Sequence, residues 1–125
     1  MDSTLLPGAV IFAGDKNRLA RFYEAAAGLQ VTHEDSIVTV LASAGFELVI
    51  HSLAGETVGD TPNPEREAYV KPFFVVKSLA AARQQAEAFG GRLDPLGAEW
   101  EARGFRACEG VDPDGNPIQF RQRAP

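Results

Sequence analysis

Few side chains in this sequence can act as a general base at neutral pH, and His51 is the strongest candidate. The chain has two histidines, and a histidine can serve as a base, a cation or an ordinary hydrogen-bond partner. His51 closes an apolar run that begins at Phe46, so it either contributes to a site or ends a strand at the surface. We interpret His33 as structural. The sequence shows no recognisable spacing of nucleophile, base and orienting group, and no glycine-rich phosphate loop.

The other reactive side chains have structural explanations. Asp112 and Asp114 belong to an Asp-Pro-Asp-Gly-Asn run, which is typical of a turn because proline presets its φ and glycine accepts a positive one. Cys108 is the single cysteine of the chain, which excludes an intramolecular disulfide. No helix N-terminus is expected beside it to create a reactive thiolate, so we interpret it as a small buried hydrophobic residue.

Composition limits the class of protein. The 125 residues fit one domain with a core of its own. The net charge of −5 and the pI near 5.0 argue against a nucleic-acid partner, since such proteins present a basic face. Apolar runs fall well short of the roughly 20 residues that cross a bilayer, so no membrane partner is expected. The first seven residues do not resemble a signal peptide, and we expect a cytoplasmic protein.

The elements that position these residues occur twice. An apolar run ends at Asp15 in the first half and another ends at Ser78 in the second, and both residues are typical helix N-caps. Apolar residues at helical spacing follow each cap. The first helical pattern ends at Gly28 and the second at Gly91, where glycine favours termination. The similarity is one of pattern more than of residue identity.

Strand-like runs follow each helical pattern. They are rich in β-branched and aromatic residues and cover 31–33, 37–41 and 46–51 in the first half, and 92–94, 105–109 and 118–122 in the second. A longer loop that carries Trp100 separates the first two runs of the second half. The segment from Ser52 to Tyr69 is polar and holds several glycines and prolines, so we interpret it as a linker.

Two strand-helix-three-strand units, the segment from Asp15 to Glu24 followed by Gly28-Leu29, and the turn from Asp112 to Asn116 together resemble the vicinal oxygen chelate superfamily. This group contains glyoxalase I, bleomycin-resistance proteins and extradiol dioxygenases. The resemblance covers nearly the whole chain. The alternative is another α+β sandwich, such as a ferredoxin-like fold.

The resemblance implies an α+β fold in which two βαβββ modules form a curved sheet around a cleft, with the helices outside. One domain then covers residues 1–125, with a first module at about 8–51, a linker at about 52–70 and a second module at about 71–123. The resemblance also implies a homodimer. Whether the modules pair within one chain or exchange between two chains stays open.

The resemblance also indicates where metal ligands would lie. Relatives that use a metal take ligands from the first and last strand of each unit, and these positions correspond to Gly8, Val49, Lys71 and Gln119. Catalytic metal sites need at least three histidine or carboxylate ligands. Glycine and valine offer no donor, a protonated lysine repels a cation, and Gln119 supplies one weak oxygen. We therefore expect neither a metal nor another cofactor.

Because side chains alternate along a strand, the neighbours of these positions should line the cleft. The expected ligand-binding residues combine aromatic walls with a few polar groups: Phe12, Glu47, Val49, His51, Lys71, Phe73, Trp100, Gln119 and Arg121.

Several of these residues have an alternative explanation. Lys71 could pair with Glu47 or extend into solvent, and Phe12 and Phe73 could belong to the core. Trp100 lies in a charged segment and either covers the cleft or anchors a dimer. Arg121 could simply be solvated near the C-terminus.

Three functions remain open. The first is a metal-independent binder of a small apolar or aromatic molecule, similar to the drug-sequestering relatives. The second is a glyoxalase-like lyase or isomerase, or a dioxygenase-related enzyme, with a displaced metal site around His51, His33 or Glu47, or with His51 as a general base. The third is a structural or interaction module without an enclosed cleft. A small molecule is the expected partner in the first two.

Overall fold

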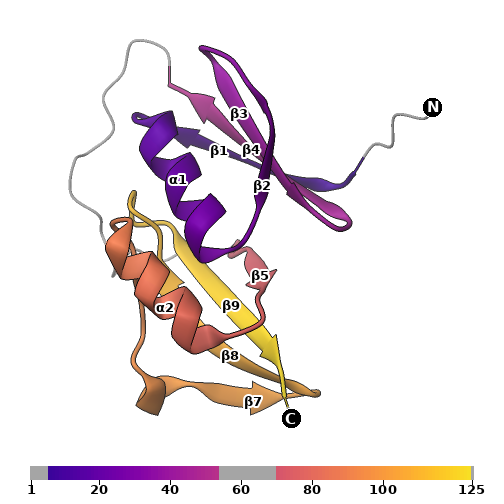
Figure 1. Cartoon of the computed structure of the whole chain (residues 1–125), viewed down its shortest axis with the longest axis vertical. Helices are drawn as coiled ribbons and strands as arrows, with labels where there is room; N and C mark the ends of the chain where they lie inside the picture. Colours follow the sequence, from indigo (N-terminus) through magenta and orange to yellow (C-terminus); the bar gives the residue numbers. More distant parts are fainter. Residues whose placement is uncertain (1–5, 54–69, 125) are drawn as a thin grey trace.

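Two β-sheets, each covered on one face by a helix, make up the fold (Figure 1). The structure is a computed structural model and describes residues 6–53 and 70–124. The first half contains β1 (Gly8–Ala13), α1 (Lys16–Ala26), β2 (Gln30–Glu34), β3 (Val38–Ser43) and β4 (Phe46–Ser52). The second half contains β5 (Phe73–Val75), α2 (Leu79–Ala88), β6 (Arg92–Leu93), the 3₁₀ turn η1 (Leu96–Ala98), β7 (Trp100–Ala102), β8 (Phe105–Val111) and β9 (Pro117–Arg123).

The two sheets have related topologies. Sheet A has the order β1-β4-β3-β2, with β1 parallel to β4 and the other pairs antiparallel. Sheet B has the order β5-β9-β8-β6, with β5 parallel to β9, and the short strand β7 also pairs with β8. In each half the first strand thus pairs with the last strand, which brings the two ends of the half together.

Both predicted helix N-caps are confirmed. Asp15 Oδ1 accepts a hydrogen bond from the backbone N–H of Arg18 at 3.1 Å, and Ser78 Oγ accepts one from Ala81 at 3.1 Å. Each cap satisfies an N–H that has no partner inside the helix. Gly28 follows α1 with a φ of 72°, a left-handed conformation that residues with a side chain rarely adopt. The sequence therefore defines both ends of α1.

Strand alternation separates a core face from an open face in both sheets. In β4, Leu48 and Ile50 are fully buried against α1. In the neighbouring strand β1, by contrast, Val10 and Phe12 each keep 56% of their surface exposed. Burying a side chain such as leucine or isoleucine stabilises the fold by about 1.5–3 kcal/mol. The core lies between each sheet and its helix, and the opposite faces are left open.

The turn after β8 joins the two halves. Tyr23 of α1 donates its hydroxyl hydrogen bond to Asp112 Oδ2 at 2.6 Å, and both side chains are buried. Arg18 pairs with Asp114 at 2.9 Å. The ring of Phe74 lies 5.3 Å from that of Tyr23, and α1 also packs against α2. The carboxylates predicted to serve only the turn therefore also hold α1.

The expected α+β class is confirmed, and the structure adds one strand. The segment with Trp100, predicted to be a loop, contains β7, which pairs with β8 through a tight turn at Arg103 and Gly104. That prediction was wrong because three residues with two charged neighbours carry almost no strand signal. The predicted linker begins with Ser52, which closes β4, and most of it lies outside the described residues. The described helices are all too short and too polar to span a membrane.

Candidate functional site

Glu109 is the centre of a polar cluster on the open face of sheet B. Its Oε1 accepts a hydrogen bond from Lys71 Nζ at 2.6 Å. Its Oε2 accepts one from Trp100 Nε1 at 3.1 Å and one from Gln119 Nε2 at 2.9 Å. Strand register explains the arrangement, because Glu109 of β8 lies directly opposite Gln119 of β9. Three of the predicted ligand-binding residues are therefore brought together by a residue that was not predicted.

Burial of Glu109 opposes ionisation, but the hydrogen bonds from Lys71, Trp100 and Gln119 and the charge of Lys71 outweigh it and lower the pKa of Glu109. Glu109 is thus a carboxylate at neutral pH, and three donors occupy most of its lone pairs. Such a group holds its neighbours in place and is a poor general base.

Arg121 continues this cluster along β9. Its Nε donates a hydrogen bond to Gln119 Oε1 at 2.5 Å. Its guanidinium carbon lies 3.6 Å from the ring centroid of Phe73 and 4.2 Å from that of Phe105. A guanidinium over an aromatic face is attracted by the ring quadrupole. Arg121 is therefore stacked between two rings on the sheet surface.

The open face of sheet A carries the other predicted residues. His51 lies opposite Phe12 in the β1–β4 register, and their ring centroids are 5.3 Å apart. Nδ1 of His51 lies 2.7 Å from the carbonyl oxygen of Ser52. A carbonyl can only accept, so Nδ1 is the protonated nitrogen and Nε2 of the neutral ring is an acceptor. Glu47 and Val49 lie on the same face, two residues apart along β4.

The predicted site residues fall into two groups. Glu47, Val49, Phe12 and His51 belong to sheet A. Phe73, Trp100, Gln119 and Arg121 belong to sheet B, and Lys71 lies just before β5 of that sheet. No hydrogen bond, ion pair or ring contact joins the two groups within the part of the chain that the structure describes. The alternative pairing of Lys71 with Glu47 is wrong, because Lys71 pairs with Glu109.

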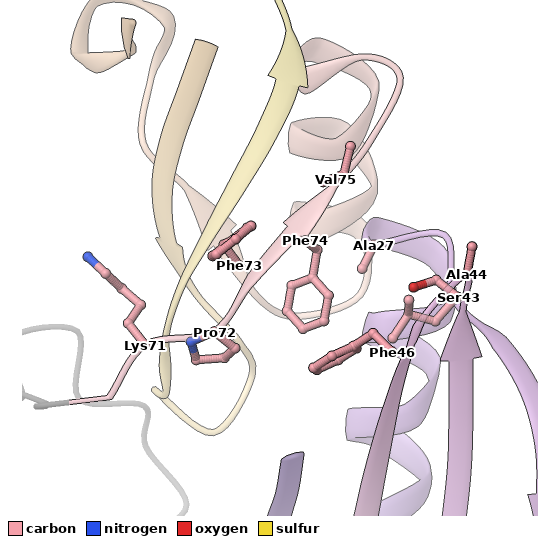
Figure 2. A pocket seen from close by; sticks show the side chains of 10 residues that line it. Ala27, Ser43, Ala44, Phe46, Lys71, Pro72, Phe73, Phe74 and Val75 are labelled. Atoms are coloured by element: carbon pink, nitrogen blue, oxygen red, sulfur yellow. The ribbon is translucent and has the colours of Figure 1, made fainter. Parts of the chain in front are cut away.

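Cavities adjoin both sides of Phe73. One of about 580 Å³ lies between β5 and the β3–β4 hairpin, with Lys71, Phe73 and Phe46 in its wall. Figure 2 shows Phe74 directed toward Phe46 of the other half, with Phe73 on the opposite side of β5. A second cavity of about 620 Å³ has Phe73, Phe105 and Arg121 in its wall. Phe12 contributes to a third, of about 280 Å³, beside Pro72 and Pro117.

The residues at the four ligand positions do not fit a divalent metal. A Cβ added to Gly8 would lie 1.7 Å from the backbone oxygen of Glu47, so this position has no room for any side chain. Val49 has no donor atom. The ammonium of Lys71 already binds Glu109, and the amide of Gln119 bonds to Glu109 and Arg121. Within residues 6–53 and 70–124, no group of three histidine, cysteine or acidic side chains is placed to hold a metal ion.

Two residues of this site were missed from the sequence. Glu109 and Phe105 both point to the open face of β8, and Ala107 lies between them on the same face. The run from 105 to 109 was predicted as a strand, and applying the period of two to it would have placed both residues beside Gln119 and Arg121.

Comparison with known proteins defines the class. Residues 9–120 match the glyoxalase-like domain family, and the chain therefore belongs to this family. None of the curated proteins matches the sequence significantly.

Solved structures support the same fold. A glyoxalase/bleomycin resistance protein from Albidiferax ferrireducens T118 superposes with a TM-score of 0.68 at 19% identity, covering 96% of this chain and 99% of that one. A glyoxalase/bleomycin resistance protein/dioxygenase family enzyme from Burkholderia phytofirmans PsJN gives 0.67 at 20% identity, covering 93% and 96%. The fosfomycin resistance protein FosX from Listeria monocytogenes gives 0.65 at 17% identity, covering 98% and 94%. Another FosX structure is a mutant complexed with Mn(II) and 1S,2S-dihydroxypropylphosphonic acid.

Proposed function

We propose that this glyoxalase-like protein binds a small apolar or aromatic molecule on the open face of sheet B without a metal. The observation that carries the proposal is the composition of that face. Phe73, Phe105 and Trp100 supply aromatic surface, and Gln119 and Arg121 supply directed polar groups. Small-molecule sites combine apolar walls with a few placed polar groups in this way.

The misfit at the four ligand positions supports metal independence. In particular, Lys71 places a cationic side chain beside Glu109 at one of the four positions that the family resemblance assigns to metal ligands. The test is to purify the protein, add Mn²⁺, Zn²⁺, Ni²⁺ or Fe²⁺, remove excess ion and measure bound metal by mass spectrometry. We expect metal well below one ion per chain, and stoichiometric retention of any of the four would contradict the proposal.

We further propose that the binding cleft is completed in a homodimer, with sheet A of one chain facing sheet B of another. Both open faces expose apolar side chains: Phe73 is 49% exposed and Val75 is 72% exposed in sheet B, and Phe12 is 56% exposed in sheet A. Clustered exposed apolar surface marks an interaction site. A closed two-fold arrangement uses the same pair of faces twice and would bring His51 to the side of the cleft opposite Gln119.

Sedimentation analysis tests the dimer. We expect a dimer for the unmodified chain and a shift toward monomer for Val75→Asp, because a carboxylate would be buried in the interface without a partner. Ala80→Asp adds the same charge at an exposed position of α2 and serves as the matched control. A monomeric unmodified protein, or equal effects of the two substitutions, would contradict this arrangement.

A catalytic role for His51 is the second candidate, and one contact favours it. The bond from Nδ1 to the Ser52 carbonyl fixes the tautomer and leaves Nε2 as an acceptor beside Phe12, which is the state a general base needs. The test is an assay of glyoxalase-type isomerase activity with His51→Ala, and with His33→Ala as the control. Activity lost only in the first variant, with folding intact, supports this role, whereas absence of activity in the unmodified protein argues against it.

A further inference from the structure

Four cationic side chains surround the cavity of about 620 Å³ at one end of sheet B: Lys77, Arg103, Arg121 and Arg123. No carboxylate contributes to its wall among the described residues. This is unusual in a chain with 17 acidic and 12 basic residues. The local charge is positive although the whole protein is acidic.

Among the described residues, these four cations have no acidic partner, in contrast to most of the other lysines and arginines. Outside the cavity, the described lysines and arginines form ion pairs with carboxylates, with the one exception of Arg21. Unpaired cations that share one concave surface repel each other and concentrate positive potential. A bound anion would relieve this repulsion.

Arg121 is already oriented for such an anion. The rings of Phe73 and Phe105 hold its guanidinium from two directions, and Gln119 occupies its Nε. The two terminal amino groups remain available to donate hydrogen bonds. A guanidinium binds carboxylate or phosphate oxygens through paired N–H groups, and little side-chain entropy remains to be lost because the stack fixes the group.

Arg103 is an independent sign of function at the same cavity. Its φ is 41°, and it is the one described residue other than glycine with a positive φ. With Gly104 at 84° it forms the two-residue turn between β7 and β8, where asparagine or glycine is the residue of choice. The turn places the guanidinium of Arg103 5.1 Å from the ring centroid of Phe105. Strained positions of this kind cluster at ligand sites.

We propose that this cavity is an oxyanion subsite, in which Arg103 and Arg121 bind the carboxylate, phosphonate or phosphate group of the ligand. The aromatic part of the ligand then lies along Phe73 and Val75 on the open face of sheet B. The subsite rests on the proposed function, since it assigns one end of the same ligand. The subsite restricts the expected class of ligand from apolar or aromatic molecules in general to those that also carry an anionic group.

Titration by NMR with three probes tests the subsite: benzoate, phenylphosphonate and the neutral isostere benzamide. We expect at least one of the anions to bind about tenfold or more tightly than benzamide, because charge-assisted hydrogen bonds are roughly twice as strong as neutral ones. The stronger of the two anions identifies the head group. Affinity for it should fall as salt rises, because the subsite is partly exposed.

Three variants distinguish a specific anion-binding site from attraction by the overall charge of the protein. Arg103→Asn suits the turn better than arginine, so it should fold at least as stably while weakening anion binding severalfold. Arg121→Gln should weaken anion binding about tenfold or more, and by a larger factor than it weakens benzamide binding, because only the anions use the charge of the guanidinium. Arg21→Gln removes the same charge from the exposed side of α1 and should change neither.

Three results would overturn the subsite. Equal affinity for benzamide and both anions would do so while leaving the proposed aromatic binding intact. Equal loss of anion binding in Arg21→Gln and Arg121→Gln would show that net charge alone attracts the anion. If none of the three probes binds, the subsite is also wrong. A thermal-shift screen of a wider set of compounds then decides separately whether the protein binds small molecules at all.

Discussion

Removing the hydroxyl of Tyr23 is the sharpest test of how the two halves are held together. Tyr23 and Asp112 are both fully buried, and their oxygen atoms are 2.6 Å apart. Asp112 Oδ1 accepts from the backbone N–H groups of Asp114 and Asn116, each at 2.9 Å, and Oδ2 accepts from Asn116 Nδ2 at 2.8 Å. Tyr23→Phe therefore removes one of four donors and leaves a buried carboxyl that water does not reach.

The expected cost follows from the type of bond. Hydrogen bonds to charged groups contribute about 1.5–3 kcal/mol, so the free energy of unfolding should fall by that amount at neutral pH. For a chain of this size each kcal/mol lowers Tm by about 3–6 °C. Denaturant unfolding monitored by circular dichroism, with an unchanged m-value, gives the difference directly.

The pH dependence gives a second signature. Burial raises the pKa of Asp112, and the Tyr23 hydrogen bond counteracts that rise. A carboxyl with a raised folded-state pKa contributes stability that is full below its unfolded pKa and lost as pH rises through the folded value. Tyr23→Phe raises the folded-state pKa of Asp112 further. The difference in the free energy of unfolding between the two proteins should therefore be largest at pH values above this pKa and should shrink in acid. A loss below about 0.5 kcal/mol at pH 7, or one independent of pH, would refute this account.

Three further predictions concern the second half of the chain. Glu99 is 3% exposed and pairs with Arg83 and Arg106; burial opposes its ionisation, but these bonds lower its pKa. The contribution of Glu99 to stability is therefore present above the ordinary glutamate pKa of about 4.3 and lost as pH falls through the lower folded value. Glu99→Gln should thus lower the free energy of unfolding by about 1–3 kcal/mol at pH 7 and by less in acid, and unfolding curves at both pH values would show the difference. Burial raises the pKa of Cys108, so a thiol reagent should modify it rapidly only after unfolding, and rapid reaction of the native protein would contradict its burial. Arg103→Asn should leave Tm equal or higher, because asparagine accepts the left-handed conformation; a clear fall in Tm would show that the arginine stabilises the turn.

Local chemistry made much of the fold predictable. Asp15 and Ser78 cap their helices through side-chain oxygens three residues from the bonded N–H groups, so the signal is contained within a few residues. The alternation of Leu48 and Ile50 with Val49 and His51 likewise follows from the strand period alone. Such features need no knowledge of distant parts of the chain.

The parts that were missed depend on contacts between distant residues. Nothing near Asp112 in the sequence indicates that Tyr23, 89 positions earlier, donates to it. β7 is a strand because β8 pairs with it, and its own three residues are uninformative. Lys71 pairs with Glu109 because β5, which follows Lys71, and β8 belong to the same sheet, whereas Glu47 lies in the other sheet. The sequence pattern alone does not give this strand order.

Ligand-induced stabilisation in the presence of a chelator tests the central claim most directly. The protein, freed of metal with EDTA, is screened by thermal shift against aromatic acids, thiol conjugates and antibiotics. The account predicts that an aromatic or apolar anion raises Tm in EDTA, by the equivalent of about 2.7 kcal/mol at one hundred times its Kd, and that added Mn²⁺ or Zn²⁺ does not increase the effect. Stabilisation that appears only when metal is restored, or a flat response to every compound, would contradict it.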